Sequence, residues 1–125
     1  MEESNDNIKK TILVAEDVES NFLLLKALLG KTYILLHAYN GSEAVEMFDN
    51  NQPDLILMDV KMPVMDGLEA TRIIRQKSTE IPIIALTAFA FDQDRIRVME
   101  AGCNDFLTKP LSPPLLKETI IKYLK

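Results

Sequence analysis

Polar side chains that could do chemistry follow the short apolar runs of this sequence. Glu16 and Asp17 come directly after TILVA, and Asp59 comes directly after LILM. Thr87 ends the run IIALT, and Lys109 follows FLT. Two carboxylates about 4 Å apart repel each other by about 4 kcal/mol at an effective dielectric constant of about 20. Acids that the fold gathers in one place must therefore take up protons or bind a cation.

The types of these residues indicate which cation and which reaction. Oxygen ligands without a neighbouring His or Cys favour a hard ion such as Mg²⁺, which keeps several waters and bridges to phosphate oxygens. The Lys109 ammonium and the Thr87 hydroxyl are both able to bind a phosphoryl oxygen. Aspartate can accept a phosphoryl group covalently, and we expect Asp59 to be the acceptor. The sequence thus predicts phosphoryl transfer to Asp59 with Mg²⁺ as the cofactor.

Apolar runs of β type alternate with patterns of helical type, and these elements would position the polar side chains. We predict strands at 11–15, 33–38, 55–58, 83–87 and 105–107, and helices at 19–29, 43–49, 68–76, 93–101 and 114–124. The first, third and fourth strands are apolar throughout, as is typical of parallel strands with helices on both faces. The prediction is an α/β fold with a single doubly wound, five-stranded parallel sheet and right-handed crossovers. In the common strand order 2-1-3-4-5, ligands bind in the crevice between the carboxyl ends of the first and third strands.

Residues typical of helix ends support these boundaries. Asn40 with Glu43 resembles a capping box at the start of a helix. Gly30 and Gly102 fall where helices often end in a left-handed residue, so we expect a positive φ at both glycines.

Composition narrows the classes of function. The chain has 125 residues, of which 47% are hydrophobic, so it suffices for one compact domain. Its 19 acidic and 14 basic residues give a net charge of -5, the wrong sign for direct binding of nucleic acid. The single cysteine, Cys103, forms no internal disulfide, and no apolar run is long enough to span a bilayer. We expect a cytoplasmic domain without membrane contact at residues 11–125, and a disordered linker or leader at residues 1–10.

Longer motifs point to a known family. LVAED, LILMDVKMPVMDG, IIALTA and FLTKP occur in this order on the predicted elements. Together they resemble the receiver domain of two-component response regulators, a CheY-like domain, over about 12–124. The resemblance implies a (βα)5 flavodoxin-like fold in which Asp59 is phosphorylated and in which Thr87 and Lys109 contact the phosphoryl group. The implied Mg²⁺ ligands are Glu16, Asp17, Asp59 and the backbone carbonyl of Lys61.

The same resemblance implies a conformational switch. Phe106 stands where the family usually has an aromatic residue that turns inward when the residue at Thr87 moves toward the phosphoryl group. This movement would remodel the surface formed by the helix at 93–101, the strand at 105–107 and the helix at 114–124.

Further expectations concern the surroundings of the site and its partners. The resemblance implies a cis peptide bond between Lys109 and Pro110, and it places Lys61 and Phe89 where variation affects access of water to the phosphoryl group. A histidine kinase or a histidine phosphotransfer domain is the implied donor. The remodelled surface is the implied site for a downstream protein, and homodimers through it occur in the family. ILVAEDVESN with MDVKMPVMDG looks most like the receivers of hybrid sensor histidine kinases. The isolated domain is not expected to be an enzyme, beyond promoting its own phosphorylation and dephosphorylation.

Other functions would leave different residues at these positions. A phosphatase of the haloacid dehalogenase type would need a second acid at the position of Lys61. A flavin- or nucleotide-binding module would need a phosphate loop rich in Gly, Ser or Thr where the chain has EDVESN. A receiver-like domain that only binds a partner would be expected to lack one of the acids or Lys109, and all are present. Taken singly, Asp59 could cap a turn, and His37 is expected to be structural rather than a catalytic base.

Overall fold

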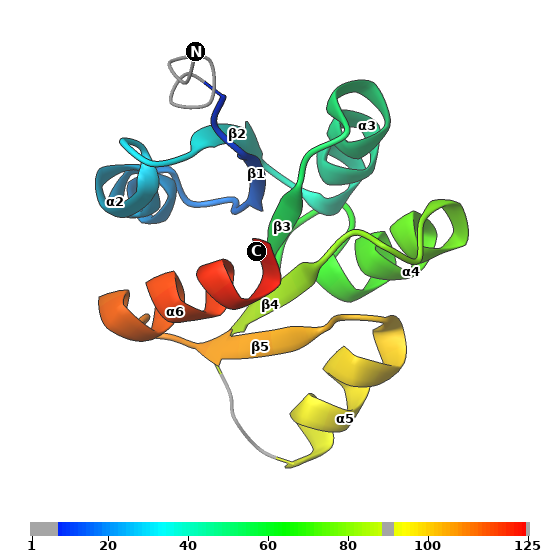
Figure 1. Ribbon diagram of the computed structural model, residues 1–125. Coiled ribbons are helices and arrows are strands. Elements are labelled where there is room, and N and C mark those ends of the chain that lie inside the picture. Colours follow the sequence, from blue (N-terminus) through cyan, green and yellow to red (C-terminus); the bar gives the residue numbers. More distant parts are fainter. Residues whose placement is uncertain (1–7, 89–91, 125) are drawn as a thin grey trace.

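Strands and helices alternate along the chain as predicted. The structure, a computed structural model, describes residues 8–88 and 92–124 (Figure 1). The strands are β1 (Thr11–Ala15), β2 (Ile34–Ala38), β3 (Leu55–Asp59), β4 (Ile83–Thr87) and β5 (Asp105–Thr108). The helices are α2 (Glu19–Leu29), α3 (Gly41–Asn51), α4 (Gly67–Lys77), α5 (Asp92–Ala101) and α6 (Pro113–Leu124). Residues 1–7 of the predicted linker lie outside the described residues.

The strands form one parallel sheet with helices on both faces. The strand order is β2-β1-β3-β4-β5, so the predicted 2-1-3-4-5 order and the doubly wound α/β fold are confirmed. Helices α2 and α6 cover one face, and α3, α4 and α5 cover the other (Figure 1). Among the described residues, no helix is long and apolar enough to cross a membrane.

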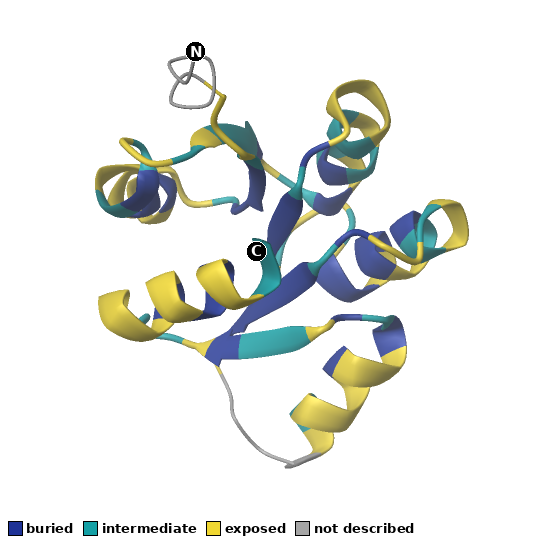
Figure 2. Cartoon of the chain, viewed as in Figure 1, coloured by how far each residue is buried: buried dark blue, intermediate teal, exposed yellow. Residues whose placement is uncertain are grey.

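The core lies in two layers, one on each face of the sheet. Strands β3 and β4 are buried at every residue, which explains why both runs are continuously apolar up to their last positions. Figure 2 shows the same division, with a buried sheet and with helices that expose their outer sides. One cluster joins the sheet to α2 and α6 through side chains such as Leu25 and Ile120, and the other joins it to α3, α4 and α5 through side chains such as Ala44 and Ile74. This double cover holds the strand ends firmly.

Helix α3 extends beyond the predicted range 43–49 at both ends, and the residues that flank it, Asn40 and Gln52, set its limits. The Asn40 side chain accepts a hydrogen bond from the N–H of Glu43 at 2.8 Å, as the capping box requires. The return bond differs from the motif, since Glu43 Oε1 accepts from the N–H of Tyr39 at 2.7 Å rather than from that of Asn40. At the other end, Gln52 has a φ of 48° and stops the helix.

The prediction of a left-handed glycine is confirmed for Gly102 and wrong for Gly30. Gly102 has a φ of 113° after α5, whereas Gly30 has a φ of -67°. The N–H of Gly30 closes the last turn of α2 on the carbonyl of Lys26 at 2.8 Å. The chain then continues in the right-handed sense, with the N–H of Tyr33 on the carbonyl of Leu29 at 2.9 Å. The backbone needs no positive φ at Gly30 because the turn is not yet finished there.

The register of the sheet brings the predicted site residues to one edge. Asp59 is the last residue of β3 and pairs with Leu86, so the strand is one residue longer than predicted. Ala15 pairs with Met58, which places Glu16 beside Asp59 where β1 ends. Gly67 begins α4 against this edge, and its N–H bonds to the carbonyl of Val60 at 2.9 Å. A Cβ at Gly67 would collide with the carbonyl oxygen of Asp59, so only glycine allows the helix to start so close to the strand end.

Candidate functional site

A pocket of about 230 Å³ opens at the carboxyl edge of the sheet, where β1, β3 and β4 end. Its lining contains every predicted metal ligand and both predicted phosphoryl contacts: Glu16, Asp17, Asp59, Lys61, Thr87 and Lys109. A larger hollow of about 580 Å³ lies at the amino ends of β3 and β4, beside Phe48 and Ile81, and holds none of these residues. The fold therefore gathers the residues that the sequence singled out, although they are far apart along the chain.

Three carboxylates converge in this pocket. Oxygen atoms of Glu16, Asp17 and Asp59 all lie within 4.8 Å of one another. Glu16 is 1% exposed and Asp59 is 5% exposed, whereas Asp17 is the more exposed member of the cluster. Buried carboxylates at such distances repel one another strongly, so the pocket favours a positive charge among them.

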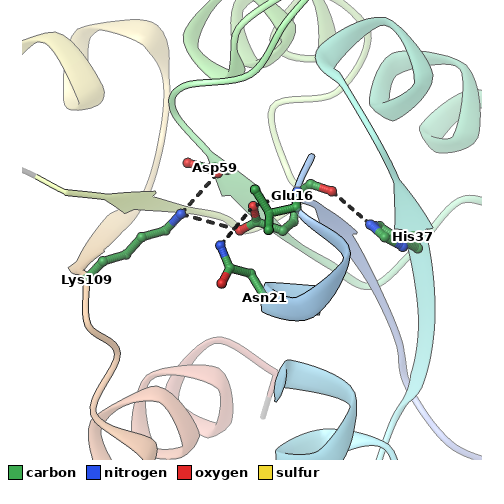
Figure 3. Close-up of polar contacts among 6 residues, drawn as sticks. Glu16, Asn21, His37, Asp59 and Lys109 are labelled. Carbon is green, nitrogen blue, oxygen red and sulfur yellow. Dashed lines mark hydrogen bonds and ion pairs between the residues drawn. The ribbon is translucent and has the colours of Figure 1, made fainter. Parts of the chain in front are cut away.

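Lys109 supplies one positive charge from the end of β5. Its Nζ lies 3.1 Å from Oδ2 of Asp59 and 3.4 Å from Oε1 of Glu16 (Figure 3). Burial lowers the pKa of Lys109, but the hydrogen bond to Asp59 and the charges of Asp59 and Glu16 outweigh it and raise the pKa above its ordinary value. The ammonium is thus held in its charged form between two carboxylates.

Burial dominates the behaviour of Asp59. It raises the pKa of Asp59 from the ordinary 3.8 to about 6, although the hydrogen bond from Lys109 acts in the opposite direction. The charge of Glu16 also raises the pKa of Asp59, and the value of about 6 is the net result of all these effects. Asp59 is therefore ionised at neutral pH, and its carboxylate is more basic than an exposed one. A basic, ionised carboxylate is suited to bind a metal or to act as a nucleophile.

Glu16 is held through both its side chain and its backbone. Its Oε2 accepts hydrogen bonds from the N–H of Val18 at 3.2 Å and from Nδ2 of Asn21 at 3.4 Å. Its own N–H donates to the carbonyl of Ala38 at 2.9 Å, and its carbonyl lies 2.8 Å from Nε2 of His37. Sequence reasoning missed Asn21 at the site, although its place in the first turn of the helix after the acidic pair was a usable signal.

The residues of the implied switch lie on the neighbouring strands. Thr87 is 7% exposed at the end of β4, and its carbonyl accepts a hydrogen bond from the N–H of Lys109 at 2.8 Å. Phe106 is half-buried in β5, and the Arg95 guanidinium carbon lies 5.2 Å from the centroid of its ring. The Lys109–Pro110 peptide bond is cis. Phe89 lies outside the described residues.

The donor set fits Mg²⁺. The cluster offers carboxylate oxygens and no nitrogen or sulfur ligand, which is the choice of a hard divalent ion. Lys61 lines the same pocket, at the position whose backbone carbonyl was expected to complete the ligand set.

Comparisons with known proteins agree with the geometry. Residues 12–121 match the family described as the response regulator receiver domain. The polar-differentiation response regulator DivK of Brucella anthropi is 38% identical over 118 residues, which is 92% of this chain and 96% of that protein.

Solved structures give the same result. The receiver domain of a sensor histidine kinase from Pseudomonas aeruginosa, determined with a magnesium ion coordinated in its active-site cleft, is 36% identical with a TM-score of 0.87, over 94% of this chain and 98% of that one. The Saccharomyces cerevisiae Ssk1 receiver domain, determined in complex with the histidine phosphotransfer protein Ypd1, is 32% identical with a TM-score of 0.88, over 93% of this chain and 89% of that one.

The raised pKa of Asp59 makes the stability of the metal-free protein depend on pH. Between about pH 4 and pH 6 the folded chain keeps a proton on Asp59 that the unfolded chain has lost, so stability falls as pH rises through this window. We expect Asp59→Asn to be more stable than wild type at pH 7.5 by roughly 1 to 3 kcal/mol, since one pKa unit corresponds to about 1.4 kcal/mol. This difference in the free energy of unfolding should be small at pH 4 and should no longer change with pH above pH 7.

Urea unfolding without divalent cations, at a series of pH values, measures this difference. Glu46→Gln, at an exposed position of α3, is the matched control and should show no such gain. A gain that is the same at every pH would contradict the assignment of the effect to the Asp59 carboxyl.

Proposed function

The chain belongs to the response regulator receiver domain family of two-component phosphorelay signalling, and we propose that Asp59 is the side chain that accepts its phosphoryl group. The observation that supports this choice is the 3.1 Å contact between the buried Asp59 carboxylate and the Lys109 ammonium, inside a pocket with two further acids. Asp17 is more exposed, and Glu16 has its oxygens engaged by Val18, Asn21 and Lys109.

The reaction needs little from the protein beyond position and charge. A carboxylate oxygen of Asp59 attacks the phosphorus of a phosphohistidine, the new P–O bond forms, and the P–N bond breaks with its electron pair going to the imidazole, which takes up a proton. Lys109 is within reach of a phosphoryl oxygen because its ammonium already lies on Asp59. Mg²⁺ bound by Glu16, Asp17, Asp59 and the Lys61 carbonyl would supply positive charge next to the phosphoryl oxygens. The same residues would promote hydrolysis of the aspartyl phosphate when water is the attacking group.

The switch would begin at Thr87. An aspartyl phosphate adds roughly -1.5 to -2 charges if phosphoserine is a fair guide, and the Thr87 hydroxyl can donate a hydrogen bond to it. Movement of Thr87 would open space for the ring of Phe106, which is now half-buried with Arg95 over it. The surface of α5, β5 and α6 would change as a result, and this is the proposed site for a downstream protein or for a second copy of the chain.

The phosphoryl donor would approach across the start of α2. A second hollow of about 210 Å³ shares Glu16, Asn21 and Lys109 with the acidic pocket and is otherwise lined by three leucines and Pro110. Leu24 on its rim is 57% exposed. A donor domain that covered this rim would bring its histidine next to the pocket that holds Asp59, so a histidine kinase or a histidine phosphotransfer domain with an apolar face is the partner that fits. Ssk1, a receiver similar to this chain, has been determined in complex with such a phosphotransfer protein.

The proposed acceptor can be tested with a small donor. Incubation with acetyl phosphate and Mg²⁺ should give a single phosphoryl adduct, measured by intact-protein mass spectrometry. The adduct should be absent from Asp59→Ala and strongly reduced without Mg²⁺, because the acids of the pocket then repel the incoming phosphoryl group. Wild-type protein that takes no adduct from acetyl phosphate, from a phosphorylated histidine phosphotransfer domain or from beryllofluoride would refute the proposal.

Thr87 should couple the phosphorylation of Asp59 to the change in the surface of α5, β5 and α6, but it should not be required for the phosphorylation itself. Thr87→Ala removes the hydroxyl but leaves Asp59, Lys109 and the acids in place. We expect it to reach nearly the wild-type level of adduct, while amide NMR signals of α5, β5 and α6 shift much less on addition of beryllofluoride and Mg²⁺. An equal loss of adduct and of signal shifts would show that Thr87 is needed for the chemistry itself.

If the donor approaches over α2, a substitution on this helix should slow phosphorylation by a protein donor and leave phosphorylation by a small molecule unchanged. Leu24→Asp should slow transfer from a phosphorylated histidine phosphotransfer domain by about tenfold or more. Loss of this apolar contact should cost about 1.4 kcal/mol or more of binding free energy, and 1.4 kcal/mol corresponds to a factor of about ten. Phosphorylation by acetyl phosphate should not change. Met99→Asp, at a residue of α5 that is 49% exposed, is the matched control and should transfer normally. Equal slowing by both variants would place the donor elsewhere.

A further inference from the structure

His37 makes a contact with the acidic segment that its place in the sheet does not require. It lies in β2, paired with Val14 of β1, and its ring is stacked between two aromatic rings. The centroid of Phe22 is 3.8 Å from that of the imidazole with an interplanar angle of 7°, and that of Tyr39 is 3.9 Å away with an angle of 30°. Nε2 lies 2.8 Å from the carbonyl oxygen of Glu16. Because a carbonyl oxygen only accepts, Nε2 carries the proton and donates it.

The carbonyl of Glu16 lies just beyond the end of the sheet ladder. The last pair between β1 and β2 is Ala15 with Ala38, and the N–H of Glu16 still bonds to Ala38. After this point the two strands lead to different elements, α2 and α3. The imidazole thus extends the pairing by one more hydrogen bond, made by a side chain instead of by the backbone. Figure 3 shows His37 and Lys109 on opposite sides of Glu16.

We propose that His37 is a positioning residue of the metal site, an inference that rests on the proposed function. The carbonyl of Glu16 and the N–H of Asp17 belong to one planar peptide unit. Holding this carbonyl fixes the rotation of the unit, and the rotation determines in which directions the Glu16 and Asp17 side chains leave the backbone. Because both carboxylates belong to the cluster that would hold Mg²⁺, a fixed peptide presents converging oxygens before the ion arrives.

The stacked rings keep the imidazole in place for this task. The Tyr39 hydroxyl donates to Oε1 of Glu19 in the first turn of α2 at 2.7 Å, and the N–H of Tyr39 donates to Glu43 of α3 at 2.7 Å. The residue on one side of His37 is therefore tied to α2 through its ring hydroxyl and to α3 through its backbone. Stacking orients the imidazole, and its N–H orients the peptide, so the two contributions of His37 can be separated by substitution.

Two variants at this position make the test. His37→Phe keeps a flat ring between Phe22 and Tyr39 and removes the donor, whereas His37→Gln keeps an N–H donor and removes the ring. We expect the Kd for Mg²⁺, measured by titration calorimetry on the metal-free protein, to rise about tenfold in His37→Phe, as is common for lost outer-shell partners of metal ligands. The Kd of His37→Gln should stay closer to wild type. The melting temperature should show the reverse order, because it responds to the lost ring.

The outcomes distinguish this inference from the proposed function. Tyr39→Phe keeps the stack and removes only the bond to Glu19, so its Kd should match wild type. Wild-type Mg²⁺ binding together with an unchanged Kd in His37→Phe would overturn the role of His37 and leave the proposed function intact. Weaker binding that follows melting temperature across all three variants would reduce His37 to a packing residue and overturn the inference. Wild-type protein that binds no Mg²⁺ would overturn both.

Discussion

The functional site depends on the contact between a buried carboxylate, that of Asp59, and the half-buried ammonium of Lys109. Asp59 ends a strand that is covered on both faces, and this burial is the largest of the effects that raise the pKa of its carboxyl group. Lys109 lies 3.1 Å away and partly offsets this effect, so the carboxylate is charged but remains more basic than an exposed one. The strand order makes the pair possible. Asp59 ends β3 and Lys109 follows β5, and only β4 lies between these two parallel strands, so both residues reach the same edge of the sheet.

The rest of the fold keeps this arrangement rigid. Apolar layers on both faces hold β3 and β4, and Gly67 lets α4 begin directly against the end of β3. Around Glu16, hydrogen bonds from Asn21 and His37 fix the side chain and the peptide. Such preorganisation matters for phosphoryl transfer because the protein contributes mainly position and charge, and a displacement of about 1 Å can slow a reaction about a hundredfold.

The sequence predicted most of the fold because its signals were local. Continuous apolar runs marked β1, β3 and β4, and the polar residue after each run marked the edge where the site lies. Gly30 was predicted wrongly because its φ depends on how the following turn packs, which no residue type encodes. The contact of His37 with Glu16 spans 21 positions and that of Lys109 with Asp59 spans 50, so the distances between them had to come from the structure. The role of His37 was invisible in sequence because its partner is a backbone carbonyl.

Lys109 also affects how a metal ion would bind in the pocket. Its ammonium already bridges Glu16 and Asp59, so a divalent ion bound by the same carboxylates would compete with a cation that is tethered to the protein. A tethered competitor has a fixed local concentration and cannot be diluted away. An ammonium displaced from these carboxylates would remain near the pocket, where it could bind a phosphoryl oxygen. Metal binding and the availability of Lys109 for a phosphoryl group would therefore depend on one and the same equilibrium.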